Sequence, residues 1–293
     1  MRRRSGKSPE VIPAERFFPK VNQPPHSPIL GGMRTPPQIT NWRDLTNWAI
    51  WPWRELLLPA ACPLCLTATE PSAGITAEYC DACREELISV EPRCRRCGNH
   101  LSPGHSLADE RCDLCRDMRL RWEGVIALGD HAGLLQQAII AAKSAKGATV
   151  AAATAQLLAT KVAETDWLKN VDLVIPTPIY WLRRIRRGFN PAERLGSEIA
   201  KRLNVKFCPH ALKITRMMRK QSDLRITARR ANVRGGFRVR TPHLLPGATV
   251  LLVDDVMTSG ATAAEITSKM LKSGAARVIV AVAARAPRGE TGN

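Results

Sequence analysis

The chain has 293 residues, of which 44% are hydrophobic, and this excludes a short peptide or a wholly disordered protein because a sizeable core can form. The formal net charge is +18, and much of it is concentrated: residues 181–240 hold 18 Lys and Arg against 3 Asp and Glu. A local excess of this kind favours polyanionic partners, such as nucleotides or nucleic acid, over a uniformly solubilising surface.

The segment at residues 1–48 is rich in Pro, Ser, Arg and Lys and has no hydrophobic periodicity. Because it cannot bury enough apolar surface to order itself, we predict a disordered basic arm. The apolar run that follows at 49–62 contains Arg54, Glu55 and two prolines, and it is shorter than the roughly 20 residues of a membrane span. We therefore expect a cytoplasmic protein without a membrane span.

Eight of the nine cysteines form four Cys-x-x-Cys pairs, and the first two pairs reappear 32 positions further on. This repeat predicts a double zinc ribbon at 49–120, with two closed all-thiolate sites whose role is structural. Disulfides are disfavoured because no export signal is visible, and iron in the same tetrahedron is the other alternative. Ligation within each repeat and an interleaved arrangement share this spacing. The predicted ligands are Cys62, Cys65, Cys80, Cys83, Cys94, Cys97, Cys112 and Cys115.

Residues 121–287 alternate between strand and helix patterns, which predicts an α/β fold with a Rossmann-like parallel sheet covered on both faces. Apolar runs indicate strands at 122–130, 171–178, 248–256 and 276–284. Three- and four-residue spacing of apolar residues indicates helices at 133–147, 148–164, 191–203 and 262–274. Asn190 and Pro191 suit the cap and first position of the third helix, and residues 288–293 are expected to form a disordered tail.

The stretch VLLVDDVMTSGAT at 250–262 places two adjacent acids, Asp254 and Asp255, at the end of a buried strand and before a Thr-Ser-Gly turn. Carboxylates accept hydrogen bonds from vicinal hydroxyls, and a turn into a helix receives a phosphate. The ligand indicated is a ribose 5-phosphate. A Walker B strand is excluded because no G-x-x-x-x-G-K-[ST] loop occurs, and a plain buried strand leaves the acids unexplained.

Two basic segments accompany this motif. Four arginines at 183–187 have no interleaved acid, which favours an anion site over a solvated helix face. The polar, basic stretch at 217–236 fits a mobile lid and a solvated surface loop equally well.

The thirteen residues at 250–262 resemble the 5-phosphoribosyl-1-pyrophosphate (PRPP) motif of type I phosphoribosyltransferases. Together with the four Cys-x-x-Cys pairs, the chain resembles the ComF family, in which a double zinc ribbon precedes a phosphoribosyltransferase domain. The runs RRGFNPAERL at 186–195 and RRANVRGGF at 229–237 are also similar to that family. Two positions depart from it: Pro191 replaces a glutamine, and the stretch 143–147 lacks an aromatic residue.

The resemblance implies a role for each part of the motif. Asp254 and Asp255 would be the catalytic acids that hold the ribose hydroxyls, and Mg2+ would accompany PRPP. The remaining PRPP contacts implied are Met257, Thr258, Ser259, Gly260, Ala261 and Thr262, with Pro176, Thr177 and Pro178 near the pyrophosphate. Candidates for pyrophosphate or nucleic acid are Arg183, Arg184, Arg186, Arg187, Arg229 and Arg230.

Two functions of different classes follow from the resemblance. The first is an enzyme that transfers the phosphoribosyl group of PRPP to a nucleobase or another nitrogen nucleophile, in DNA uptake and competence or in nucleotide metabolism. The alternative is a protein that handles single-stranded DNA and keeps a non-catalytic PRPP site. In a third arrangement the ribbon docks a DNA-uptake helicase or translocase. With five Phe and two Tyr, the sequence shows no clamp for a base and leaves the acceptor open.

Overall fold

The computed structural model describes residues 61–69, 78–89, 91–101, 111–144, 147–218 and 226–286. All of them belong to one compact unit, Ala60–Asn293. The arm at 1–48 and the tail at 288–293 lie outside the described residues, as does the apolar run up to residue 60. Among the helices that are described, none is long and apolar enough to cross a bilayer.

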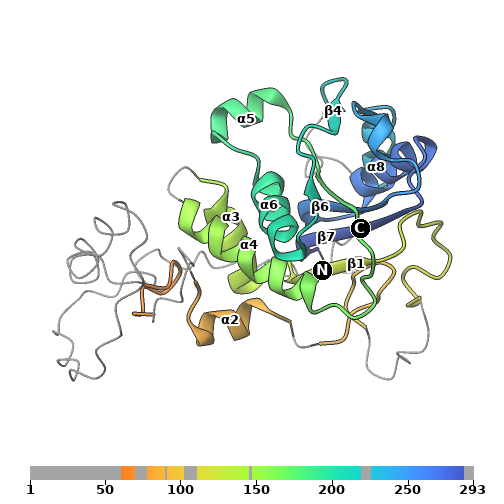
Figure 1. Cartoon of the computed structure of the whole chain (residues 1–293). Helices are drawn as coiled ribbons and strands as arrows, with labels where there is room; N and C mark the ends of the chain where they lie inside the picture. The colour runs from red at the N-terminus through yellow and green to blue at the C-terminus, as the bar shows by residue number, and fades with distance from the viewer. Residues whose placement is uncertain are drawn as a thin grey trace, which may run out of the picture. The chain divides into compact units, whose positions relative to one another are not determined.

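Five strands form a central sheet in the order β1-β7-β6-β2-β3, and every neighbouring pair is parallel. The predicted parallel sheet is therefore confirmed (Figure 1). Two further strands, β4 and β5, form a separate antiparallel pair. The strands are β1 (Val125–Asp130), β2 (Leu173–Pro176), β3 (Lys206–Phe207), β4 (Leu212–Ile214), β5 (Phe237–Val239), β6 (Thr249–Met257) and β7 (Arg277–Arg285).

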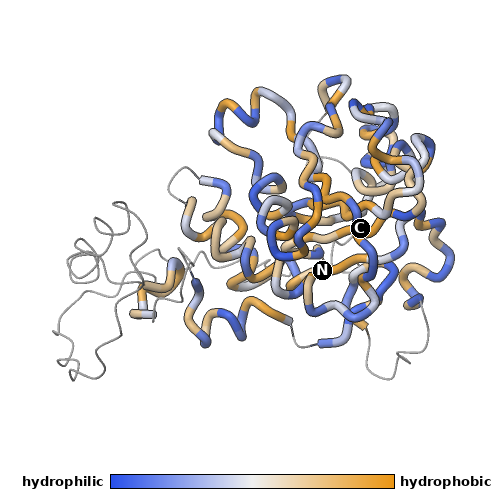
Figure 2. The backbone as a smooth tube through the Cα atoms, viewed as in Figure 1, coloured by the Kyte–Doolittle hydropathy of each residue, from blue (hydrophilic) through white to orange (hydrophobic). Residues whose placement is uncertain are grey.

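Alternate side chains of the central strands point to opposite faces of the sheet and pack into two separate hydrophobic cores. This explains why these strands are apolar throughout (Figure 2). In β6, Leu251 and Val253 pack on the side of helices α3, α4 and α6. Val250 and Leu252 point the other way, into the core that includes helix α8. The helices are α3 (Gly133–Ala142), α4 (Ala148–Ala163), α6 (Pro191–Leu203) and α8 (Ala261–Lys272).

Helix α6 has the bounds that the sequence predicts. The Asn190 side chain accepts a hydrogen bond from the backbone N of Ala192 at 3.1 Å, and Pro191 occupies the first turn. Helix α3 is shorter than the predicted helix 133–147, because a tighter turn, with Lys143 N donating to Ile140 O, closes it at Ala142.

Three short helices were not predicted: α2 (Asp81–Leu87), α5 (Trp181–Arg187) and α7 (Ile226–Val233). Helix α5 carries the four clustered arginines, and it contains no buried residue. Helix α7 covers part of the predicted lid, whose residues 219–225 lie outside the described residues.

The two cysteine modules repeat each other in backbone geometry as well as in sequence. Leu66 N donates to Cys62 O at 2.9 Å, and Gly98 N donates to Cys94 O at 2.8 Å. Leu66 and Gly98 both have positive φ, 63° and 73°, at equivalent positions of the repeat. The duplicated module is therefore a pair of equivalent Cys-x-x-Cys knuckles.

Candidate functional site

The candidate site lies at the carboxyl ends of β2 and β6, where the strand order reverses. From β2 the chain continues through α6 to β3, and from β6 it continues through α8 to β7 on the other side. Such a switch point leaves a crevice that binds ligands in open α/β sheets. Thr177 N donates to Val253 O at 2.8 Å, so the loop after β2 runs directly beside Asp254.

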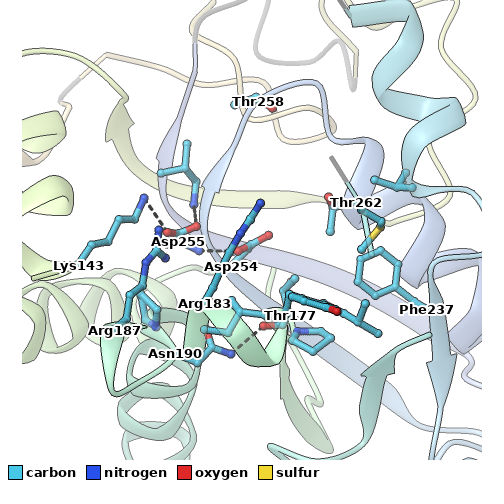
Figure 3. A pocket seen from close by; sticks show the side chains of 18 of the residues that line it. Lys143, Thr177, Arg183, Arg187, Asn190, Phe237, Asp254, Asp255, Thr258 and Thr262 are labelled. Carbon is cyan, nitrogen blue, oxygen red and sulfur yellow. Dashed lines mark hydrogen bonds and ion pairs between the residues drawn. The ribbon is translucent and has the colours of Figure 1, made fainter. Parts of the chain in front are cut away.

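A cavity of about 260 Å³ occupies this crevice (Figure 3). It brings together residues from the loop after β2, from α5, from β6 and from the start of α8. Eight of the predicted site residues line it: Thr177, Pro178, Arg183, Arg187, Asp254, Asp255, Thr258 and Thr262.

The other predicted residues do not line this cavity. Pro176 is buried and does not line this cavity. Met257, Gly260 and Ala261 line a smaller adjoining cavity that shares Asp254, Thr258 and Thr262 with the first, and Ser259 lines a separate groove. Arg184 pairs with Glu193. Arg186, Arg229 and Arg230 do not belong to the cavity lining.

Lys143 lies in the cavity, a position to which the sequence argument assigned no role. Its Nζ is 2.8 Å from Oδ2 of Asp255, and the two side chains are 26% and 24% exposed. Lys143 comes from the end of α3, more than a hundred residues before its partner. The sequence places Lys143 inside a predicted helix and in the stretch 143–147 that was compared with the family, but neither signal points to Asp255.

The two adjacent acids differ in electrostatics. Burial, and next the neighbouring charge of Asp255, raises the pKa of Asp254 well above its usual value. Burial also opposes ionisation of Asp255, but the charge and hydrogen bond of Lys143 outweigh it and hold the pKa of Asp255 below its usual value. Lys143 thus neutralises Asp255, whereas Asp254 lines the cavity without an ion-pair partner among the described residues.

Asn190 connects the cavity to α6 as well as capping that helix. Its Nδ2 donates to Thr177 O at 3.0 Å, while its Oδ1 caps the helix. The loop after β2 is therefore tied to a helix start (Figure 3). The Thr177 Oγ1 atom is buried and has no hydrogen-bond partner among the described residues. An unpaired buried hydroxyl on a cavity wall favours a ligand that pairs with it.

The turn between β6 and α8 requires glycine for two reasons. Gly260 has a φ of 75°, and a β-carbon added there would lie 3.0 Å from Cη2 of Trp122. Both the left-handed backbone and the close approach exclude a side chain. The amide groups of the first turn of α8 follow immediately, which is the arrangement that binds phosphate groups.

Part of the cavity wall is apolar and aromatic. Tyr180 lies at the end of the loop after β2, and Phe237 begins β5. Ile214 of β4 and Val233 of α7 complete this side. No sequence pattern identified these residues as a group, because they come from four separate elements.

Each cysteine quartet has the geometry of a tetrahedral zinc site. The eight residues separate into two groups, Cys62, Cys65, Cys80 and Cys83 and then Cys94, Cys97, Cys112 and Cys115, whose sulfurs lie within 4.8 Å of one another. The structure thus groups the ligands within each repeat. A zinc ion with bonds of about 2.3 Å to four thiolates separates them by about 3.8 Å, and the Cys94 and Cys115 sulfurs are 3.7 Å apart.

The electrostatics of the four clustered thiols also favour binding of a cation. A hydrogen bond with Cys97 lowers the pKa of Cys94 to about 4, whereas burial raises the pKa of Cys115 to about 12. All nine cysteines of the chain are free of disulfides. Four thiols this close repel one another when ionised, and a dication removes the repulsion, so the residues fit structural zinc.

Comparison with known proteins matches two separate parts of the chain. Residues 53–118 match the double zinc ribbon domain, and residues 187–291 match the phosphoribosyl transferase domain. The chain is 29% identical over 228 residues to the DNA utilization protein YhgH of Escherichia coli O157:H7, covering 77% of this chain and 96% of the relative. It is 28% identical over 211 residues to Competence protein F of Haemophilus influenzae, covering 71% and 90%. The two matched domains, in this order, and these relatives confirm the resemblance to the ComF family.

The resemblance to the ComF family agrees with the fold and with both cysteine quartets. Among solved structures, the glutamine PRPP amidotransferase of B. subtilis is similar at 18% identity with a TM-score of 0.35, covering 50% of this chain and 30% of that one. A TM-score at this level adds nothing to the fold assignment, which rests on the strand order and the matched domains.

Proposed function

We propose that this chain binds PRPP with Mg2+ and transfers its phosphoribosyl group to a nitrogen nucleophile. The observation that carries the proposal is that one cavity, beside the start of α8, brings together carboxylates, hydroxyl groups and cations. Few ligands other than a phosphorylated sugar diphosphate require all three. The unpartnered Thr177 hydroxyl adds support from outside the motif.

The ribose and its 5-phosphate are assigned to the end of β6 and the turn after it. Asp254 and Asp255 accept hydrogen bonds from the ribose hydroxyls. Thr258 and Thr262, with the amides of the first turn of α8, donate to the phosphate. The adjacent carboxylates also stabilise the positive charge that develops on the ribosyl ring as the leaving group departs.

The pyrophosphate is assigned to the basic side of the cavity. Lys143, Arg183 and Arg187 supply three cations there, on the side of the two acids (Figure 3). Asp254 and Asp255 are oxygen donors of the kind that Mg2+ prefers, and the raised pKa of Asp254 indicates a carboxylate that a cation would stabilise. Mg2+ would neutralise charge on the departing pyrophosphate.

The transfer step breaks one bond and forms one. The bond between ribose C1 and the pyrophosphate oxygen breaks, and its electron pair leaves on that oxygen. The acceptor nitrogen forms the new bond to C1 and releases a proton. The apolar wall with Tyr180 and Phe237 supports a flat, ring-shaped acceptor, because aromatic and aliphatic side chains pack against planar rings.

The relatives support a role of this activity in the use of DNA. Those compared above are named for DNA utilization and for competence. Single-stranded DNA binding with a non-catalytic PRPP site is the second candidate, and the specific observation that favours it is the exposed helix α5, with Arg184 and Arg186 outside the cavity lining. A basic, solvent-facing helix attracts a phosphate backbone.

Calorimetric titration of the zinc-loaded, full-length protein with PRPP and Mg2+ tests the proposal, with and without a short single-stranded DNA. Arg187→Gln is expected to weaken PRPP binding about tenfold or more, since it removes a charge-assisted hydrogen bond. Arg186→Gln is the matched control, because Arg186 lies on the same helix but outside the cavity lining. It is expected to leave PRPP affinity unchanged.

Three outcomes separate the candidates. PRPP binding that only Arg187→Gln weakens supports the assignment, and release of pyrophosphate in the presence of a base then identifies the acceptor. Tight DNA binding, with PRPP bound but no pyrophosphate released in the presence of any base, supports the second candidate instead. Equal losses of PRPP affinity in both variants would contradict the placement of the pyrophosphate.

A further inference from the structure

Arg285 is a buried cation that the candidate site does not use directly. It ends β7 and is 1% exposed, although it is one of the largest side chains in the core. Its Nε donates to Cys97 O at 2.9 Å. Its Nη1 donates to Met257 O at 2.8 Å and also to Thr258 O. One guanidinium therefore joins the backbone of a zinc knuckle to the backbone at the turn between β6 and α8. This turn, residues 258–260, is called the phosphate turn below.

Trp122 makes a second connection between the same two segments. Its Nε1 donates to Arg96 O at 2.8 Å, and Arg96 lies between Cys94 and Cys97. Its ring lies against Gly260, where an added β-carbon would be 3.0 Å away. Consecutive carbonyls of the knuckle, those of Arg96 and Cys97, thus accept bonds from two side chains that also contact residues 257–260.

The position of these carbonyls depends on the metal site. Cys97 is itself a predicted ligand, so bonds to zinc would fix the backbone of the knuckle. Without the ion, only contacts of 3.5–3.8 Å between the sulfurs would hold the four cysteines together. A buried guanidinium cannot give up its acceptors without a large cost in free energy. If the knuckle moves, Arg285 must move with it or lose its hydrogen bonds, and either change alters the support of Met257 and Thr258.

The first cysteine quartet is anchored elsewhere. Tyr79, next to Cys80, donates its hydroxyl to Val150 O of α4 at 3.0 Å. Cys62 and Cys83 pack into the core of α3 and α4, whereas Met257 and Trp122 belong to the core on the other face of the sheet. The two zinc sites of the repeat therefore occupy different structural contexts despite their matching sequences.

We propose that the second zinc site, at Cys94, Cys97, Cys112 and Cys115, sets the conformation of the phosphate turn, with Arg285 as the positioning residue that transmits it. Binding of a ribose 5-phosphate group then depends on zinc at the second site and not on zinc at the first. The expected change in PRPP affinity rests on the proposed function. The expected change in the conformation of the turn does not depend on it.

The repeat offers a matched pair of variants, Cys112→Ser in the second site and Cys80→Ser in the first, because these cysteines occupy equivalent positions. Metal analysis should show that each variant loses the zinc of one site. In the full-length, zinc-loaded protein, Cys112→Ser is expected to weaken PRPP binding about tenfold and to speed hydrogen exchange at the amides of 257–261. Cys80→Ser is expected to leave both measurements close to those of the unsubstituted protein.

Arg285→Lys tests the transmitting residue. A lysine keeps the buried charge, but its ammonium lacks the fork that reaches the Cys97 and Thr258 carbonyls together. The variant should retain both zinc ions, weaken PRPP binding and speed exchange at 257–261. Adding Cys112→Ser to it should cause little further loss, because both changes break one connection, whereas a purely structural role for Arg285 predicts additive effects.

Equal effects of Cys80→Ser and Cys112→Ser, or an unchanged exchange rate at 257–261 in Cys112→Ser, would overturn the proposal. If the unsubstituted protein binds no PRPP, the proposed function fails, but the exchange comparison between the two cysteine variants still decides whether the second zinc site supports the turn.

Discussion

Replacing Asp254 and Asp255 one at a time by asparagine should shift the free energy of unfolding in opposite directions. Both acids accept a local backbone hydrogen bond, Asp254 from Asp255 N and Asp255 from Val256 N, and asparagine preserves it. The substitutions therefore isolate the charge. Asp255→Asn leaves Lys143 without its carboxylate, while Asp254→Asn removes a buried charge that has no cation of its own.

The magnitude for Asp255→Asn follows from the burial of the ion pair. Removing one partner of a fully buried pair costs about 3–5 kcal/mol, and a surface pair contributes about 0–1 kcal/mol. Because the Lys143 and Asp255 side chains are 26% and 24% exposed, we expect a loss of about 1–2 kcal/mol. This corresponds to a fall in Tm of roughly 2–8 °C for a domain of this size. Asp254→Asn should raise the free energy of unfolding instead.

The pH dependence distinguishes the two variants further. A carboxyl whose pKa is raised on folding contributes stability at low pH that is lost as the pH rises toward its folded pKa. The advantage of Asp254→Asn should therefore be smallest at about pH 4 and grow as the pH rises toward that raised pKa. The pKa of Asp255 is lowered, so its contribution is already complete above about pH 4. The deficit of Asp255→Asn should therefore stay constant over that range.

Urea denaturation followed by tryptophan fluorescence measures both effects, with zinc content checked at each pH. PRPP titration of the same samples should show that both variants lose affinity, because each acid is assigned to the ribose hydroxyls. Shifts of the same sign at pH 7 would refute the electrostatic account of the pair. Retained PRPP affinity in either variant would refute the assignment of that acid.

Three further substitutions test the surroundings of the cavity. Gly260→Ala should lower the free energy of unfolding by about 1–2 kcal/mol, measured by urea denaturation, because its φ is 75° and the methyl group would meet Trp122; an unchanged midpoint would contradict the need for glycine. Asn190→Ala should cost about 1 kcal/mol by the same measurement through loss of the cap on Ala192, and it should also weaken PRPP binding through the freed loop. Thr177→Val should leave stability unchanged or slightly higher, since the buried hydroxyl has no partner among the described residues, and calorimetry should show weaker PRPP binding; full affinity would mean that no ligand pairs with this hydroxyl.

Patterns within short stretches of sequence predicted much of the fold. The continuous apolar strands at 171–178 and 248–256 indicated a sheet buried on both faces, because alternate residues of a strand face opposite cores. The 32-residue repeat of cysteine pairs indicated two metal modules, because the Cys-x-x-Cys spacing is itself typical of a tetrahedral zinc site. The cap and proline at 190–191 predicted the start of α6, whose hydrogen bond is local.

The sequence by itself thus determined the sheet, the repeat and the acidic motif, whose signals lie within a few neighbouring residues. Only the tertiary structure decided that Lys143 neutralises Asp255, that the basic and apolar walls share one cavity, and that Arg285 is buried. Arg285 and Cys97 lie 188 residues apart, and no local pattern links such a pair. They come into contact because the fold places the end of β7 beside both the second zinc knuckle and the phosphate turn. A guanidinium buried there is stable only because carbonyl groups of those two segments accept its hydrogen bonds.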